Sequence, residues 1–519
     1  MNLKALPNRT YNILFHTHTV TGIVICCALY IIFYAGAFAL FKDEIYQWEN
    51  HEARVVPNAN VDYDQLVAKF LETHPNAKID DHLTIVFPSK NIPVIRLYAE
   101  IENDDATHTR IIQAINPNTL AIPDDTSLKT TVGETIFRLH YFDQIPTFGL
   151  YLAGFVSLFF LFATVTGILI HWKNVLQKFY AYTTDGKWKT IWTNAHTVLG
   201  IITVPFQVVF AVTGALFGLL FFLLAPSTVV LFDGDSAPIF EIFSPQEGIP
   251  LDENAPYNPN LKGINFLYQK SQEHFPEQEV VMANFHHFGK DDANVSFYVD
   301  DGSGILGDGV VVYAMKTGEY LAEITPNHKN YSQAVYNLLI KLHFGTFGGI
   351  VLKIVYFLLA LITCYVLISG ILIWKVAREN KNYTQKQQRF YHRVTKAYLA
   401  ICLSLFPATA LLFAANKLVP MEMGARVGAV NSIFFIGWLL MAVAGLFFNK
   451  YRKLNNFYVI LGGILSLSVP IANGIVTGDW LWASLQKGLV QVFCVDLFWL
   501  LTGLIALFVY WKFGKNKSR

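Results

Sequence analysis

Four histidines occupy matching positions in two halves of the chain, and imidazole nitrogen is a ligand for haem iron and for Zn or Cu. His18 opens an apolar segment as His-Thr-Val-Thr-Gly, and His196 opens another as His-Thr-Val-Leu-Gly. His140 and His343 each follow a leucine ahead of a further apolar segment, and each precedes a Gly-Ile-Leu-Ile sequence by 27 residues. Matching intervals of this kind indicate an internal duplication whose unit is helix, polar insertion, helix.

Glycines recur at helical intervals from the first histidine of each repeat. Gly22 lies about one turn after His18, and Gly36 lies 18 residues after it, which is five full turns of an α-helix. The second repeat has Gly200 and Gly214 in the same relation to His196. These glycines are expected to share a face with the histidine and to leave room for a flat, bulky group beside the ligand nitrogen.

The second histidine of each repeat has no glycine on its own face. Gly167 and Gly370 follow His140 and His343 by 27 residues, which is seven and a half turns if the helix is unbroken. We therefore assign Gly167 and Gly370 to helix packing.

The elements that position these residues are membrane spans. Of the 519 residues, 53% are hydrophobic and only 15% are charged, against about 25% charged in soluble domains. Eight apolar segments are long enough to cross a bilayer: 20–41, 148–172, 198–224, 350–374, 397–415, 430–448, 457–476 and 488–510. The formal net charge of +1 argues against a nucleic-acid partner, because no excess positive charge meets a phosphate backbone.

Basic residues cluster after every second span, which predicts the orientation of the chain. They crowd the connections 173–197 and 375–396, the connection after the sixth span, and the C-terminus. Those segments and both termini are therefore expected in the cytoplasm. Residues 1–41 are interpreted as a retained first span rather than a cleaved signal, and residues 397–519 as a further four-helix membrane region.

Two polar insertions, 42–147 and 225–349, fall on the opposite, external side. Each begins with helical spacing (64–74 and 266–274) and continues with alternating strand-like segments. The expected strands are 83–87, 94–100 and 109–114 in the first insertion and 295–299 and 309–314 in the second. Each insertion is predicted to be a small α+β module, and neither contains a nucleophile–base pair or a phosphate loop. No catalytic group is expected beyond the metal-ligating histidines.

The duplication predicts how the histidines meet. Two parallel repeats place His18 opposite His196 near the cytoplasmic side and His140 opposite His343 near the external side. Two opposed imidazole pairs in a four-helix bundle suit two b-type haems, which together form an electron path across the bilayer. The fold class is thus a mainly α, polytopic membrane protein with a duplicated four-helix haem bundle. A Zn or Cu site is the competing metal hypothesis, but it lacks nearby Asp, Glu or Cys ligands.

Several other residues are candidates near these sites. His171 ends the second span and is an alternative ligand on the cytoplasmic side. Arg138 and Lys341, each two residues before a repeated histidine, are candidates to balance haem propionates, or else they are interfacial anchors. The pair at 286–287 is interpreted as a surface feature of the second insertion.

These motifs resemble the PepSY-associated transmembrane family, which includes membrane ferric-siderophore reductases of the ferrioxamine-reductase type. The resemblance covers roughly residues 15–375 and rests on the His-x-x-x-Gly and Leu-His starts and on the Thr-Gly or Ser-Gly pairs at 166–167, 213–214 and 369–370. The insertions resemble PepSY domains. The family resemblance implies a bacterial inner-membrane protein whose two haems pass electrons to a periplasmic ferric siderophore or other ferric chelate, freeing Fe(II) for uptake.

The electron donor and the C-terminal region are less constrained. No dinucleotide-binding fingerprint follows Lys375, so the donor is expected to be a separate flavin or NAD(P)H reductase or a quinol. Asp496 and Asn473 lie inside C-terminal spans, where they either handle protons or quinone or form a helix–helix hydrogen bond. Two alternative functions remain: quinone-linked electron transfer to a periplasmic redox partner, and non-enzymatic regulation of a periplasmic peptidase.

Overall fold

Eight helices are long and apolar enough to cross a membrane, as the hydropathy predicted. The computed structural model describes residues 6–51, 54–55, 60–79, 83–89, 92–102, 108–122, 132–180, 182, 186–302 and 304–514. Two compact units divide the chain: a membrane unit (1–49, 130–221 and 353–519) and a unit formed by the two insertions (50–129 and 222–352), which we name the external unit after its predicted side. The chain is mainly helical with one small sheet region, so the prediction of a mainly α protein with eight membrane spans is confirmed.

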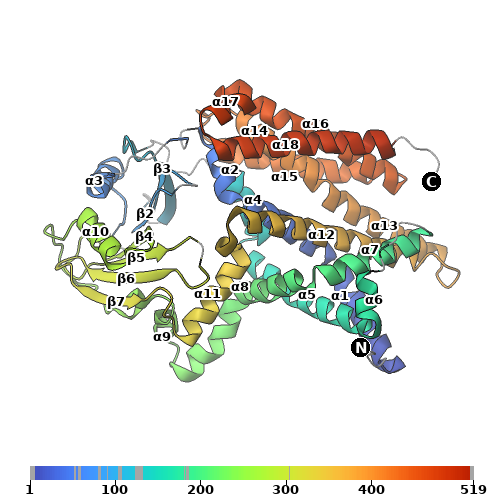
Figure 1. The fold of residues 1–519 in the computed structure, drawn as a ribbon, viewed down its shortest axis with the longest axis horizontal. Helices are drawn as coiled ribbons and strands as arrows, with labels where there is room; N and C mark the ends of the chain where they lie inside the picture. The colour runs from blue at the N-terminus through green and yellow to red at the C-terminus, as the bar shows by residue number, and fades with distance from the viewer. Residues whose placement is uncertain are drawn as a thin grey trace. The chain divides into compact units, whose positions relative to one another are not determined.

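The second and fourth spans begin and end within two residues of the predicted boundaries, whereas the third runs from 204 to 231 instead of 198 to 224 and the first begins earlier than predicted. Their helices are α1 (Asn8–Ala39), α5 (Gly149–Ile170), α8 (Val204–Leu231) and α12 (Gly349–Val376) (Figure 1). Helix α1 starts twelve residues before the expected start at Val20. It therefore carries His18 within a regular helix instead of at its end.

Short helices flank these spans and carry much of the chemistry. They are α2 (Lys42–Glu49), α4 (Gly133–His140), α6 (Val175–Phe179) and α7 (Trp188–Ile202). Helix α7 ends just before α8 because Pro205 lacks an N–H and its ring clashes with the carbonyl four residues earlier. His196 therefore lies on a short helix of its own.

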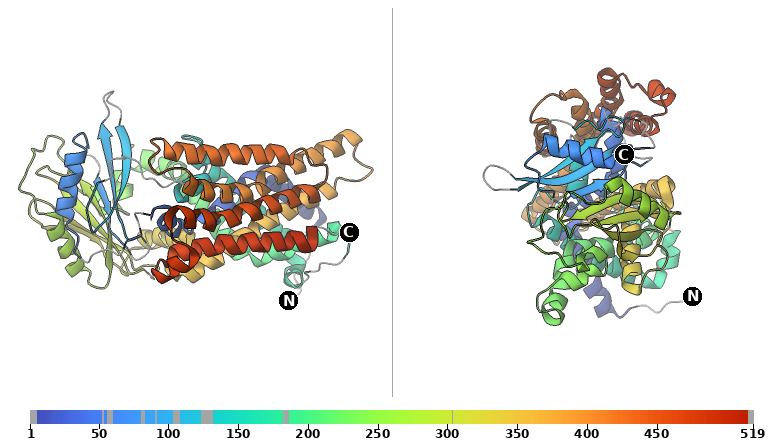
Figure 2. Two further views of the ribbon diagram at one scale, coloured as in Figure 1. Left: turned by 90° about the horizontal axis from the view of Figure 1, so that it is seen from above. Right: turned by 90° about the vertical axis from the view of Figure 1, so that its left-hand side faces the viewer.

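The C-terminal region forms a second set of long helices in the membrane unit. They are α13 (Gln385–Leu403), α14 (Leu405–Leu418), α15 (Arg426–Gly445), α16 (Tyr451–Thr477), α17 (Leu481–Gln486) and α18 (Val490–Val509). Helix α14 packs against α15 and α16, and α16 packs against α18, so the long helices lie side by side in Figure 2. Pro407 causes the break between α13 and α14 in the same way as Pro205 does between α7 and α8.

The external unit is built around one antiparallel sheet of seven strands in the order β3-β2-β1-β4-β5-β6-β7. The first insertion contributes β1 (Leu83–Val86), β2 (Ile95–Glu102) and β3 (His108–Ile115). The second contributes β4 (Glu279–His286), β5 (Asn294–Asp300), β6 (Gly309–Ala314) and β7 (Tyr320–Ile324). We expected two separate modules, but β1 pairs with β4, with Leu83 opposite Phe285. The two insertions therefore form one domain.

Helices α3 (Tyr63–Thr73) and α10 (Ile264–His274), one from each insertion, share the core on this sheet. The Asp64 carboxylate accepts the backbone N–H groups of Ile264 (2.5 Å) and Asn265 (3.1 Å), so α3 caps the free donors at the start of α10. Helices α9 (Ala237–Glu241) and α11 (Tyr331–Phe344) complete the unit. Strands β4 and β7 were not predicted from the sequence.

Candidate functional site

His18 and His196 come together within the membrane unit. Helix α1 carries His18 and α7 carries His196, and their ring centroids lie 6.1 Å apart with ring planes at 71°. The duplicated positions that the sequence singled out are thus spatial neighbours, although 178 residues separate them along the chain. The pairing of the first span with the third, which parallel repeats require, holds at this point.

Each of these imidazoles is held by a backbone carbonyl of a different helix. Nδ1 of His18 lies 2.8 Å from the carbonyl oxygen of Ala163 on α5, and Nδ1 of His196 lies 2.9 Å from that of Val366 on α12. A carbonyl oxygen only accepts, so Nδ1 carries the proton and donates it. The lone pair is left on Nε2, which is the form in which histidine binds a metal.

Gly167 and Gly370 make this close approach possible. A Cβ atom at either position would lie 3.1 Å from Cε1 of His18 or His196, respectively. Each glycine stands four residues after the accepting carbonyl, so glycine and acceptor occupy one helix face. We expected these glycines to serve helix packing. The group that packs against each of them is the histidine on the first helix of the same repeat.

The hydroxyl before each of these glycines bonds to the same carbonyl as the histidine. Thr166 Oγ1 donates to the Ala163 carbonyl at 3.1 Å, and Ser369 Oγ donates to the Val366 carbonyl at 2.8 Å. The pairs at 166–167 and 369–370 are therefore parts of one histidine-holding motif. The third pair, at 213–214, is not, because Thr213 donates to Val209 of its own helix.

His140 is held by the same motif at a third place. Its Nδ1 lies 2.8 Å from the Ile32 carbonyl oxygen, and a Cβ on Gly36, four residues later, would lie 2.8 Å from its Cε1. Gly36 was predicted to serve His18. At about 27 Å along the helix from His18, it contacts His140 instead, so that prediction was wrong.

The glycines one turn from the first pair face open space. No heavy atom of the described chain lies within 4 Å of a Cβ built on Gly22, and only Val366 Cγ1 approaches that of Gly200, at 3.9 Å. The fourth predicted glycine, Gly214, packs instead on Ser157, whose Oγ would lie 2.7 Å from such a Cβ. A group beside the pair would therefore meet little steric resistance from the chain at Gly22 and Gly200.

The donor set of this pair fits a metal held between two imidazoles. Metal–imidazole nitrogen bonds are about 2 Å long, so two imidazoles on opposite sides of one metal have centroids roughly 6 Å apart. Burial, and then the proximity of His18, lower the pKa of His196 to about 4, and burial lowers the pKa of His140. Both are neutral at physiological pH, as a metal ligand must be.

His171 lies directly after α5 and is partly buried. Burial lowers its pKa, followed by the effects of Lys178 and His18, so it lies close enough to the pair for their charges to interact. It stays an alternative ligand, whereas the ring contact is between His18 and His196.

The two predicted propionate partners already contact carboxylates. Arg138 donates to Glu134 at 2.8 Å and to Asp143 at 3.3 Å. Lys341, on α11 of the external unit, donates to both oxygens of Asp300 at 3.0 and 2.9 Å. These ion pairs account for both side chains without a propionate.

His343 also lies on α11, in the external unit. That it faces His140 stays a prediction. In the same unit, His287 is not simply a surface residue, because its Nδ1 lies 3.0 Å from both carboxylate oxygens of Asp292.

Asp496 is fully buried among the C-terminal helices. One of its oxygens accepts the indole N–H of Trp48 at 2.8 Å and the other accepts the amide N–H of Asn473 at 2.7 Å. This is the helix–helix hydrogen bond that the sequence left open. Sequence reasoning missed Trp48 as a partner because α2 lies about 450 residues earlier in the chain.

In a comparison with protein families, the model of the PepSY-associated TM region matches residues 15–378, more than half of the chain. All four repeated histidines fall within the match. The C-terminal helices from residue 379 onward lie outside it. No curated protein matches the chain.

Proposed function

Since the chain belongs to the PepSY-associated transmembrane family, we propose that it is a di-haem b oxidoreductase of the bacterial inner membrane. It carries electrons from the cytoplasmic side to a periplasmic acceptor. The acceptor is a ferric siderophore or another ferric chelate, which makes the protein a ferric-chelate reductase. The donor is a cytoplasmic flavin or NAD(P)H reductase or a quinol.

One observation carries this proposal: two imidazoles from duplicated positions stand 6.1 Å apart with Nδ1 of each bound to a backbone carbonyl. A lone interfacial histidine needs no such arrangement. The same tether on His140 makes it the first ligand of the second proposed haem, with His343 as the predicted partner.

A bound haem supplies one-electron transfer between donor and acceptor. The chain holds each ligand in one tautomer, since the Nδ1–H bond to a carbonyl fixes the ring and makes Nε2 more basic. Apolar helices around the pair exclude water, which keeps the ligands neutral. At the acceptor, one added electron converts Fe(III) to Fe(II), which binds less tightly to hard oxygen ligands and is released.

The test is a reduced-minus-oxidised absorption spectrum of the detergent-purified protein, with a pyridine haemochrome count of haem per chain. We expect two low-spin b haems in the unmodified protein. His18→Ala and His196→Ala are each expected to lose one haem. His16→Ala, a substitution of an exposed histidine on the same helix, is the matched control and retains both.

Reductase activity is measured in proteoliposomes with a reductant on one side and a ferric siderophore on the other. A protein that binds no haem when haem is supplied contradicts the proposal and favours peptidase regulation. Two haems without ferric reduction but with quinol oxidation favour the quinone-linked alternative.

A further inference from the structure

The C-terminal helices lie outside the family match, and the proposed electron path gives them no role. Their contacts with the rest of the membrane unit point to one. Helices α14 and α18 both pack against α2, and α2 packs against α4, the short helix that ends at His140. Each of these contacts includes buried polar bonds.

Lys417, near the end of α14, holds the C-terminus of α2. Its ammonium donates to the carbonyl oxygens of Trp48 (2.5 Å) and Glu49 (3.2 Å) and lies 4.2 Å from the centroid of the Trp48 ring. The last carbonyls of a helix lack partners within it and carry partial negative charge. A buried cation therefore caps α2 from another helix.

Asp496, on α18, binds the same turn of α2 through the side chain of Trp48. It accepts the Trp48 indole N–H at 2.8 Å while its other oxygen is fixed by Asn473 of α16. Trp48 is completely buried and its ring also packs on Phe413 of α14. Three C-terminal helices thus fix one residue of α2.

Helix α2 in turn holds α4. The Glu49 carboxylate accepts the backbone N–H of Val132, at the start of α4, at 2.7 Å. Lys42, at the other end of α2, pairs with Glu134 at 2.6 Å. Gly133 allows this approach, because a Cβ there would lie 3.3 Å from the Lys42 carbonyl oxygen.

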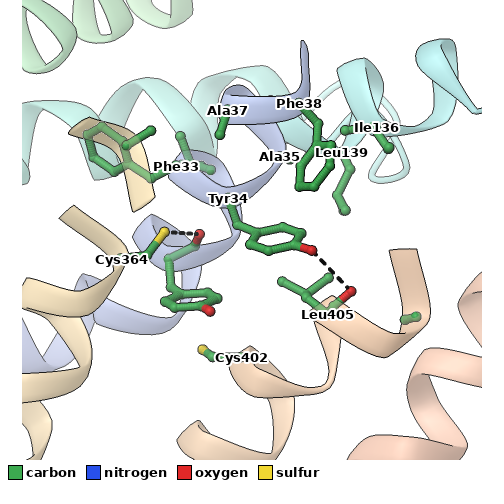
Figure 3. Packing of buried hydrophobic residues seen from close by; sticks show 14 of the residues in the cluster. Phe33, Tyr34, Ala35, Ala37, Phe38, Ile136, Leu139, Cys364, Cys402 and Leu405 are labelled. Carbon is green, nitrogen blue, oxygen red and sulfur yellow. Dashed lines mark hydrogen bonds between the residues drawn. The ribbon is translucent and has the colours of Figure 1, made fainter. Parts of the chain in front are cut away.

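A direct bond adds to this indirect support. Thr135 of α4 donates to the side-chain oxygen of Asn431 on α15 at 2.5 Å. On the apolar side, Ile136 and Leu139 of α4 pack beside Phe38 of α1, in the core shown in Figure 3. The same figure shows the Tyr34 hydroxyl of α1 bonded to the Leu405 carbonyl of α14, at 3.4 Å.

We propose that the C-terminal helices act as a scaffold that positions His140, with Lys417 and Asp496 as positioning residues that act through α2 and α4. This inference rests on the proposed function in that His140 is taken as a haem ligand. The scaffold fixes the height and rotation of α4 and therefore the position of the His140 ring. The Ile32 carbonyl then orients that ring. The His18–His196 pair makes no contact with this network in the described part of the chain.

The test uses the full chain with Lys417→Met and Asp496→Ala. Lys453→Met is the control, because Lys453 is an exposed lysine of α16 with no described bond to α2, to α4 or to the residues that hold them. Two readouts are taken: haem per chain with the low-spin electron paramagnetic resonance signals, and hydrogen–deuterium exchange of the α4 amides. Lys417→Arg and Asp496→Asn, which keep a donor and an acceptor, are the conservative variants.

We expect Lys417→Met and Asp496→Ala to lose or alter one of the two haem signals and to raise α4 exchange at least tenfold. The other haem signal and exchange at α7 stay unchanged. Lys417→Arg restores both readouts, Asp496→Asn restores them in part because its amide keeps one of the two acceptors, and Lys453→Met behaves as the unmodified protein. Equal changes at both haems, or unchanged α4 exchange, overturn the scaffold.

The exchange readout separates this inference from the proposed function. If the unmodified protein binds no haem, the proposed function fails, but faster α4 exchange confined to the two variants still supports the scaffold. If two haems bind and Lys417→Met leaves both their signals and α4 exchange intact, the scaffold fails and the proposed function stands.

Discussion

At the scale of single residues, the most informative positions are glycines. Three histidines approach a neighbouring helix so closely that a Cβ beneath the ring would lie 3.1 Å away at Gly167 and Gly370 and 2.8 Å away at Gly36. Each glycine follows by four residues the carbonyl that accepts the histidine Nδ1–H. Helix arithmetic along one chain segment could not find this, because the histidine and its glycine belong to different helices. The Gly-Ile-Leu-Ile repeat could be found in the sequence, but the histidine that contacts its glycine could not.

Gly167→Ala and Gly370→Ala are expected to displace His18 and His196, respectively. The added Cβ lies 3.1 Å from Cε1, and the ring cannot swing away without losing its carbonyl bond. Overpacking of this kind costs about 1–3 kcal/mol. The measurement is the haem absorption and paramagnetic resonance spectrum of each variant, with Gly428→Ala, which meets no atom within 4 Å, as the control. Unchanged spectra in both variants contradict the tether.

Gly22→Leu tests whether the open space beside His18 belongs to a cofactor. The site is open, so the variant should fold without haem as stably as the unmodified protein. If the macrocycle occupies that space, the variant should lose one haem. Thermal unfolding of haem-free protein and haem content are measured together, with Gly428→Leu as the control. Normal haem content in Gly22→Leu places the cofactor elsewhere.

At the scale of elements, three of the four proposed ligands lie on short helices, α4, α7 and α11, and His18 alone lies on a long one, α1. Helix α11 carries His343 and is tied to the external sheet by side chains on one of its faces. Lys341 bonds to Asp300 at the end of β5, and Asn337 donates to the Ile305 carbonyl (2.6 Å) and to Asp308 (2.7 Å). The Asn330–Gln333 capping box starts this helix and Gly345, with φ of 64°, ends it. Sequence patterning predicted none of these ties, because they depend on a loop between strands.

Asp300→Ala is expected to loosen α11. It leaves the ammonium of Lys341, whose side chain is 7% exposed, without its carboxylate. Removing one partner of a buried pair costs about 3–5 kcal/mol, and the partial exposure of Asp300 places the effect toward the lower end. Hydrogen exchange of α11 amides measures it. The control is Asp291→Ala, which breaks a more exposed pair with Lys316, where water screens the two charges. Equal exchange in the two variants contradicts the expectation.

At the scale of the whole molecule, hydropathy and internal repetition were enough to predict eight spans, the fold class and the first histidine pair. These rest on local composition and on intervals that a duplication preserves. The single sheet was not predictable in the same way. Its central pairing joins Leu83 to Phe285, across two membrane spans, and each insertion alone shows only the pattern of a small separate module. The missed strands β4 and β7 belong to the same part of the fold.

The joint sheet predicts that damage in one insertion spreads to the other. Ile85→Asp places a charge at a fully buried position of β1, opposite Ala283 of β4. An unpaired buried carboxylate is strongly unfavourable, so exchange should rise in β4 and β5 as well as in β1. Glu72→Ala, on the exposed side of α3, is the control. Protection retained in β4 would mean that the insertions fold independently.

The pairing of β1 with β4 also has a consequence for how the chain is made. Strand β3 ends at Ile115 and β4 begins at Glu279, so the ribosome adds about 160 residues between them, which takes roughly 8–30 s at ordinary elongation rates. Throughout that interval β1 is an edge strand with unpaired backbone groups, the kind of edge that invites aggregation. The nascent first insertion must therefore be shielded, by a holding factor or by the membrane itself, until its other half is synthesised.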